Sequence, residues 1–170
     1  MNRSCCIETP VGPLTVVADE QAVRAIRFGA GSDAPAAMPA SSEPLPVVLR
    51  QVVQELEDYF AGRRRTFTVP VAPAGTPFQQ RVWQALRQIP YGATCSYRAI
   101  AEAIGAPKAC RAVGMANHRN PIPIIIPCHR VVGADGRLTG YASGLEIKAT
   151  LLRIEQGCRC RQRSQELPGE

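Results

Sequence analysis

The chain has 170 residues, 45% of them hydrophobic, which suffices for one or two small domains with an ordinary buried core. It has neither the roughly 18 consecutive apolar residues of a membrane span nor the apolar run of a secretory signal, so we expect a cytoplasmic protein. The net charge is +6, and residues 76–170 carry 13 Lys or Arg against six Asp or Glu. This basic half suits a polyanion such as nucleic acid, although many basic proteins bind none.

The first half of the chain predicts an antiparallel sheet followed by a helix. Three short apolar runs separated by turn residues are typical of an antiparallel meander: 4–7, 14–18 and 22–28. Residues 29–46 are rich in Gly, Pro, Ala and Ser and predict a loop. Apolar residues then follow helical spacing from Pro46 to a natural stop at Gly62, and residues 67–71 predict one more strand.

A linker rich in proline and glycine precedes residue 76 and divides the chain. We expect an N-terminal domain at 1–75, a C-terminal domain at 76–157 and a polar, disordered tail at 158–170. The second domain begins with Thr76-Pro77-Phe78-Gln79, which combines an N-cap residue, a first-turn proline and a capping glutamine. This capping box predicts a helix that ends at Pro90-Tyr91-Gly92.

The next segment has the spacing of a helix-turn-helix. Ser96 caps a short helix, Gly105-Ala106-Pro107 makes the turn, and Ala109–Ala116 forms the second helix. This second helix is so poor in bulky side chains that its backbone can lie close to a partner surface. Packing of the same small residues inside the protein is an equally good interpretation.

Proline positions shape the segment that follows. Three prolines forbid a helix within 120–127, so its isoleucines are expected to run extended and buried. Asp135-Gly136 predicts the turn of a small hairpin. A last helix is predicted at 146–156, with a stop at Gly157.

Cys128 and His129 directly follow the buried segment. The seven cysteines have no regular disulfide spacing, so we expect reduced thiols, and the sequence predicts neither a metal site nor a cofactor. A nucleophilic thiol needs a base or a positive field to ionise at neutral pH. His129 is the candidate base and Glu155 the candidate carboxylate that orients it. Taken alone, the dipeptide is better explained as a small buried side chain beside a core histidine.

The wider pattern changes this interpretation. Residues 120–132 have the sequence NPIPIIIPCHRVV, which resembles the active-site signature of the O6-alkylguanine-DNA alkyltransferases. The resemblance extends over 76–157 and includes further matching segments: Pro77-Phe78-Gln79, Ile89-Pro90-Tyr91-Gly92, Ser96-Tyr97, Lys108–Gly114 and Thr139-Gly140-Tyr141. The N-terminal half resembles the family only in outline.

The resemblance implies a fold and an activity. The fold is α/β, with a ribonuclease H-like N-terminal sheet and helix and a winged-helix-like C-terminal domain that carries the helix-turn-helix. The activity is direct-reversal DNA repair, in which an alkyl group passes irreversibly from O6-alkylguanine to Cys128, one lesion per protein. Activity on O4-alkylthymine and the preferred adduct size stay open.

Position by position, the resemblance also implies roles for individual residues. The catalytic group comprises Cys128 as alkyl acceptor, His129 as its water-linked base, Glu155 as the carboxylate on His129, Tyr97 as the hydroxyl on the guanine leaving group, and Asn120 as a brace of the active-site turn. The DNA-binding group is Ser96, Ala109, Arg111, Ala112, Val113 and Gly114. The substrate pocket is Pro123, Val131, Tyr141, Ala142 and Ser143.

The implied partner is double-stranded DNA that contains alkylated bases, with no membrane involved. The second helix of the helix-turn-helix would enter the minor groove, and Arg111 would fill the space of the flipped nucleotide. A phosphate contact is the alternative role for Arg111. We expect a monomer, with cooperative assembly on DNA left open.

Two other classes of protein compete with this interpretation. A cysteine hydrolase would use the same Cys128 and His129, and burst kinetics with small esters would identify it. A helix-turn-helix regulator without catalysis would prefer a particular undamaged DNA sequence.

Overall fold

The computed structural model describes residues 2–29, 44–136 and 144–166, with side chains as far as residue 157. The predicted loop at 29–46 and the return strand of the hairpin predicted at Asp135-Gly136 fall largely outside these ranges. The predicted combination of an antiparallel sheet with helices is confirmed. Among the described helices, none is long and apolar enough to cross a membrane.

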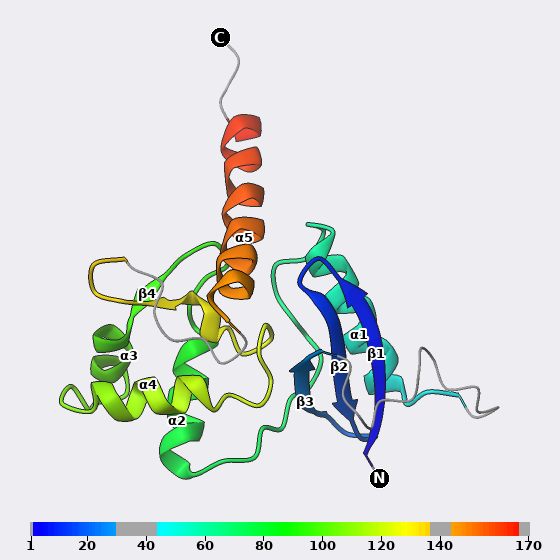
Figure 1. Ribbon diagram of the computed structural model, residues 1–170, viewed down its shortest axis with the longest axis horizontal. Coiled ribbons are helices and arrows are strands. Elements are labelled where there is room, and N and C mark those ends of the chain that lie inside the picture. Colours follow the sequence, from blue (N-terminus) through cyan, green and yellow to red (C-terminus); the bar gives the residue numbers. More distant parts are fainter. Residues whose placement is uncertain (1, 30–43, 137–143, 167–170) are drawn as a thin grey trace.

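The N-terminal half forms the predicted antiparallel meander. Strand β1 (Arg3–Thr9) pairs with β2 (Gly12–Ala18), and β2 pairs with β3 (Val23–Phe28). Helix α1 (Val47–Phe60) packs against this sheet (Figure 1). Its fully buried apolar residues recur every three or four positions and form one face of the helix: Leu49, Val52, Leu56 and Tyr59.

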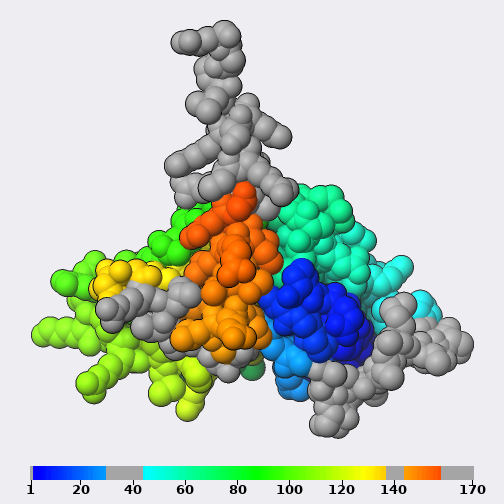
Figure 2. All heavy atoms as spheres, turned by 45° about the horizontal axis from the view of Figure 1, so that its top comes forward, coloured from blue at the N-terminus to red at the C-terminus, as the bar shows by residue number. Residues whose placement is uncertain are grey.

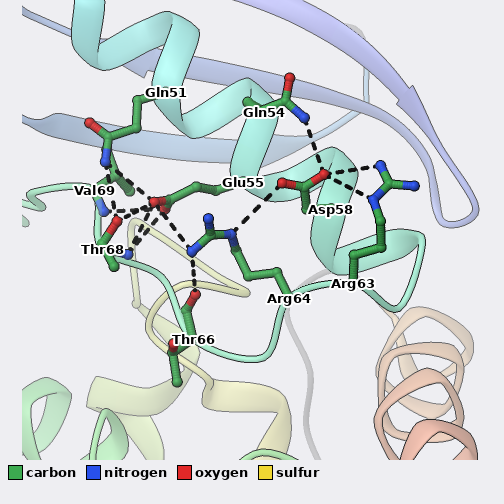
Figure 3. A network of polar contacts seen from close by, with 9 residues as sticks. All are labelled: Gln51, Gln54, Glu55, Asp58, Arg63, Arg64, Thr66, Thr68 and Val69. Atoms are coloured by element: carbon green, nitrogen blue, oxygen red, sulfur yellow. Dashed lines mark hydrogen bonds and ion pairs between the residues drawn. The ribbon is translucent and has the colours of Figure 1, made fainter.

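The strand predicted at 67–71 is wrong. Val71 makes one isolated bridge to Val23, and no ladder forms around it. The backbone N–H groups of residues 68–69 instead donate to the carboxylate of Glu55 on α1 at 3.2 Å (Figure 3). The following residue is a proline, which has no N–H to donate. A buried carboxylate therefore takes the donors that a strand ladder would need.

The C-terminal half begins with the predicted capping box. Helix α2 (Pro77–Leu86) starts where the Thr76 hydroxyl accepts from the Gln79 N–H at 3.1 Å. The Gln79 side chain accepts in return from the Thr76 N–H at 2.9 Å. Farther along α2, the buried Trp83 indole donates to the Ala116 carbonyl at 2.9 Å, which fixes this helix to the helix-turn-helix.

The helix-turn-helix is present as predicted. It consists of α3 (Tyr97–Ala103) and α4 (Cys110–His118). The Ser96 hydroxyl accepts a hydrogen bond from the first turn of α3 at 3.0 Å and is the expected cap. Two short strands, β4 (Cys95–Ser96) and β5 (Val131–Val132), pair in parallel beside these helices.

The isoleucines of 120–127 are buried as predicted, but the expected extended conformation is wrong. The segment folds back in a turn, in which the Ile126 N–H donates to the Ile122 carbonyl at 3.0 Å. Ile124 adopts a φ of 75°, which is rare for a β-branched residue. The isoleucines of the turn are at most 5% exposed, so their burial stabilises a backbone that is locally strained.

Helix α5 (Leu145–Glu166) is longer than predicted. The stop at Gly157 and the disordered tail at 158–170 are therefore wrong as far as Glu166. One glycine inside a helix costs only about 1 kcal/mol relative to alanine. The residues beyond it include several Arg, Gln and Glu, which favour helix and continue the element.

The two halves share a continuous hydrophobic core. The Ile26 N–H of β3 donates to the Pro121 carbonyl at 2.9 Å, which joins the sheet to the turn at 120–127. Figure 1 shows α5 rising between the N-terminal sheet and the C-terminal helices, and Figure 2 shows its atoms (orange) against those of the N-terminal strands (blue). One residue near the end of α1, Tyr59, reaches Glu155 on α5 with its hydroxyl at 2.8 Å.

Candidate active site

The predicted nucleophile lies in a short 3-10 helix, η1 (Cys128–Arg130), between the turn and β5. The Arg130 N–H donates to the Pro127 carbonyl at 3.0 Å, which closes the helix, and the Cys128 N–H donates back to the Ile126 carbonyl at 2.8 Å. Cys128 is 4% exposed and His129 is fully buried. The thiol is thus held in the core, at the end of a rigid turn.

Asn120 is the polar support of that turn. Its side-chain amide donates to the Ile126 carbonyl at 2.8 Å, and its side-chain oxygen accepts from the Ile122 N–H at 3.0 Å. The same side chain therefore supplies both a donor and an acceptor to backbone groups of the turn, which belong to no regular helix or strand. These two hydrogen bonds link Asn120 to the backbone of the turn.

His129 and Glu155 form a buried pair. Nε2 of His129 lies 2.7 Å from Oε1 of Glu155, and both side chains are inaccessible to solvent. An ionised carboxylate only accepts hydrogen bonds, so Nε2 carries the proton and Nδ1 carries the free lone pair. Burial lowers the pKa of His129, and the neighbouring Glu155 opposes this shift. The imidazole is therefore neutral at physiological pH and can accept a proton at Nδ1.

Arg130 completes the environment of Glu155. Its Nε lies 3.0 Å from Oε2 and its Nη2 lies 2.9 Å from Oε1, a bidentate ion pair that is almost fully buried. Burial alone would raise the pKa of Glu155, but His129 and Arg130 outweigh it and lower that pKa to about 2. Glu155 is therefore an anion at neutral pH.

Lys148 is a further buried charge that sequence reasoning missed. It is fully buried on α5, and its ammonium group interacts electrostatically with Cys128. Burial lowers the pKa of Lys148, and the Cys128 thiolate acts in the opposite direction. A signal for it exists in the sequence, because its spacing places it on the buried stripe of the last helix: Lys148, Leu151, Leu152 and Glu155.

Tyr97, the predicted acid, is the first residue of α3 and is half-buried. Its ring lies 3.9 Å from the position that a Cβ on Gly114 would take, so the small residues of α4 leave room for it. The Ser96 hydroxyl is engaged as the helix cap, and its backbone pairs with Val132 of β5. Of the predicted pocket, Val131 and Pro123 are buried near η1, whereas Tyr141, Ala142 and Ser143 lie outside the described residues.

The residues of α4 are divided between the protein core and an exposed surface, so each of the two predicted interpretations holds for part of the helix. Val113 is fully buried, so its side chain belongs to the core and is not a DNA contact. Ala109 and Gly114 are half-buried. The opposite face is open to solvent and basic: Arg111, Ala112, Met115, His118 and Arg119. The structure therefore presents a positively charged helix face beside the turn that carries Cys128.

Two family models match the chain. Residues 3–73 match the ribonuclease-like domain of 6-O-methylguanine DNA methyltransferase, and residues 77–157 match the DNA binding domain of the same enzyme. These matches agree with the predicted fold class.

Individual relatives and solved structures lead to the same family. A methylated-DNA–protein-cysteine methyltransferase of Methanosarcina acetivorans is 50% identical over 151 residues, which are 89% of this chain and 96% of the relative. The constitutive enzyme of that name from Bacillus subtilis is 46% identical and covers 92% of this chain and 96% of its own length. The crystal structure of Mycobacterium tuberculosis OGT in complex with DNA aligns with a TM-score of 0.80 at 44% identity, covering 91% of this chain and 93% of that one. The chain belongs to the 6-O-methylguanine DNA methyltransferase family.

Proposed function

We propose that the protein repairs DNA directly by moving a methyl group from the O6 atom of guanine to the sulfur of Cys128. The observation that carries this proposal is the buried series Cys128, His129 and Glu155. Glu155 orients His129, and His129 is the base for the Cys128 thiol. The exposed basic face of α4 supplies a surface for the DNA backbone. The names of the relatives describe the same reaction.

The chemistry follows from the order of these groups. His129 takes the thiol proton at Nδ1, directly or through water, while Glu155 stabilises the resulting imidazolium. The thiolate attacks the methyl carbon, the carbon–oxygen bond breaks, and a carbon–sulfur bond forms. Tyr97 donates a proton to the departing guanine, and the thiol proton held by His129 restores the neutral tyrosine through solvent. Because water does not hydrolyse the thioether, each protein molecule acts once.

The lesion reaches Cys128 only after its nucleotide leaves the base stack, which costs a few kcal/mol. We assign Arg111 to the space that the flipped nucleotide leaves, since it lies on the exposed face of α4. Ala109, Ala112 and Gly114 have no bulk that would hold this helix away from a groove. The protein would bind double-stranded DNA that contains alkylated bases and act as a monomer, in the minor groove.

The test is intact mass spectrometry and peptide mapping after mixing the protein with a duplex that carries one O6-methylguanine. We expect a gain of one methyl group, confined to Cys128 and complete at one lesion per protein. Cys128→Ser removes the acceptor and should show no gain, whereas Cys6→Ser, a substitution in β1, should react like the parent. Tight binding of the lesion without any mass gain would refute the reaction and indicate a damage sensor.

A further inference from the structure

Tyr59 connects the N-terminal half to the catalytic residues. It lies near the end of α1, is fully buried, and packs against the rings of Phe60, Phe67 and Tyr91 at centroid distances of 5.2, 5.5 and 6.2 Å. Its hydroxyl donates to Oε1 of Glu155 at 2.8 Å. This hydrogen bond joins two residues that are 96 positions apart in the sequence.

Glu155 is held by donors from several elements, and they divide unevenly between its two oxygens. Oε2 accepts from the Gly92 N–H at 3.2 Å and from Nε of Arg130 at 3.0 Å. Oε1 accepts from Tyr59, from Nε2 of His129 at 2.7 Å and from Nη2 of Arg130 at 2.9 Å. The Tyr59 hydroxyl thus shares one oxygen atom with the imidazole. Any change in its hydrogen bond alters the charge and the position of the atom that holds His129.

We propose that Tyr59 is a positioning residue for the transfer reaction, which acts through Glu155 on the orientation and the protonation of His129. The N-terminal half then completes the catalytic network and is more than a scaffold. This inference rests on the function proposed above, because it concerns the same nucleophile and base. Its hydroxyl contacts the carboxylate of Glu155, so its effect on the reaction passes through that residue.

The direction of its effect follows from the charges around His129. Glu155 and Lys148 face it from α5, Arg130 and Cys128 belong to η1, and Tyr59 acts from α1 through Glu155. Burial lowers the pKa of His129, Glu155 raises it, and Arg130 and Lys148 lower it. A hydroxyl that donates to Oε1 neutralises part of the negative charge next to the imidazole. Its removal therefore makes His129 hold a proton to higher pH.

The chain allows this titration to be measured directly, because it contains only two histidines. His118 is exposed on α4 and provides an internal reference, and His118→Gln assigns its signal. We expect the NMR titration midpoint of His129 to rise by roughly half a pH unit or more in Tyr59→Phe, with His118 unchanged. Phe60→Leu is the matched control, since it disturbs the packing of the same ring but keeps the hydroxyl; it should leave the His129 midpoint unchanged.

Methyl-transfer kinetics provide the second readout. Below neutral pH, Tyr59→Phe should react several-fold more slowly than the parent, and the two rates should converge as the pH rises and His129 loses its proton. Affinity for the methylated duplex should be unchanged. A purely structural role of Tyr59 predicts instead that Tyr59→Phe and Phe60→Leu are both less stable than the parent. Neither the His129 titration nor the pH dependence of the transfer rate would then shift.

Labelling with 3-fluorotyrosine tests the inference in the opposite direction and keeps the hydroxyl. Fluorination makes each tyrosine hydroxyl a stronger donor, so the His129 midpoint should fall. Equal midpoints in the parent, Tyr59→Phe and the fluorinated protein would overturn the inference. A parent that titrates as expected but transfers no methyl group would refute the proposed function instead, and the two failures are therefore distinguishable.

Discussion

Glu155 carries a negative charge in the centre of the molecule, where an isolated carboxylate is costly. The charge is stabilised because the side chains of Tyr59, His129 and Arg130 and the backbone of Gly92 donate to it. Removing one partner of a buried ion pair costs far more than the net contribution of the pair, because the other charge is left unpaired. The network therefore fixes the position of His129 and makes local stability depend on this carboxylate.

Glu155→Gln keeps the size of the side chain and removes the charge. We expect a loss of about 3–5 kcal/mol in the free energy of unfolding at neutral pH, because Arg130 remains buried without an anion. The pKa of the carboxyl group is lowered from 4.5 to about 2 in the folded protein, so its contribution is present above pH 4.5 and is lost as the pH falls towards 2. Urea unfolding at several pH values measures the difference between the two proteins.

The control for this prediction is Glu146→Gln, an exposed acid in the first turn of the same helix. It should change stability by less than about 1 kcal/mol. If Glu155→Gln were as stable as this control at neutral pH, the carboxylate would not be needed as the partner of Arg130.

Lys148 places a positive charge near the reactive sulfur, and a nearby cation favours a thiolate. Lys148→Met should therefore raise the pKa of Cys128 and slow its reaction with iodoacetamide at neutral pH, with recovery at higher pH. Peptide mapping isolates the reaction at Cys128 from that of the other cysteines. The chain has one other lysine, the exposed Lys108, so Lys108→Met is the matched control. If the reaction of Cys128 with iodoacetamide had the same pH midpoint in Lys148→Met and Lys108→Met, the assigned influence of Lys148 would be contradicted.

The sequence predicts those active-site residues that chemistry makes recognisable. Cys128, His129 and Glu155 were expected from the logic of a nucleophile, a base and an orienting carboxylate, and the structure brings the last two within 2.7 Å. Tyr59 carries no such signal, because a tyrosine in a helical apolar stripe is indistinguishable from an ordinary core residue. Only the packing of α1 against the C-terminal half brings its hydroxyl to the carboxylate.

At the scale of elements, local signals predict helix starts better than strands or helix ends. The capping box at Thr76 and the cap at Ser96 depend on residues three positions apart and form as expected. The strand at 67–71 fails because its donors go to Glu55, thirteen or more positions earlier in the chain. The turn at 120–127 also escapes prediction, since a positive φ at an isoleucine becomes acceptable only when tertiary burial stabilises it.

The exposed face of α4 leads to a prediction about how DNA is held. If Arg111 replaces a flipped nucleotide, Arg111→Ala should slow methyl transfer from duplex DNA roughly tenfold or more. Transfer from a single-stranded substrate should be affected much less, because no base has to leave a stack. If Arg111 only contacts a phosphate, the same substitution should weaken binding to both the duplex and the single strand. The salt dependence of the binding constant should then fall by about one released counterion. Arg98→Ala removes an exposed arginine of α3 that pairs with Glu102 and serves as the control. Transfer rates on the two substrates at several salt concentrations decide between the two roles.

At the scale of the whole molecule, Cys128 belongs to a core that both halves share. The turn that carries it is joined to β3 by a backbone hydrogen bond, and the carboxylate behind His129 is joined to α1. Packed cores accommodate an added methyl group poorly, because neighbouring side chains must leave their preferred rotamers. We therefore expect a methyl group added at the sulfur to disturb the packing of both halves of the chain.

Methylation of Cys128 should destabilise the protein for this reason. Cys128 is 4% exposed, so the new methyl group crowds a packed site, at a cost of about 1–3 kcal/mol. For a chain of this length that corresponds to a fall in Tm of roughly 2–12 °C. Thermal unfolding after complete methylation, with the DNA removed, measures the shift, and Cys128→Ser treated with the same duplex controls for the handling. An unchanged Tm would mean that the pocket already has room for the methyl group, and that the spent protein is as stable as the active one.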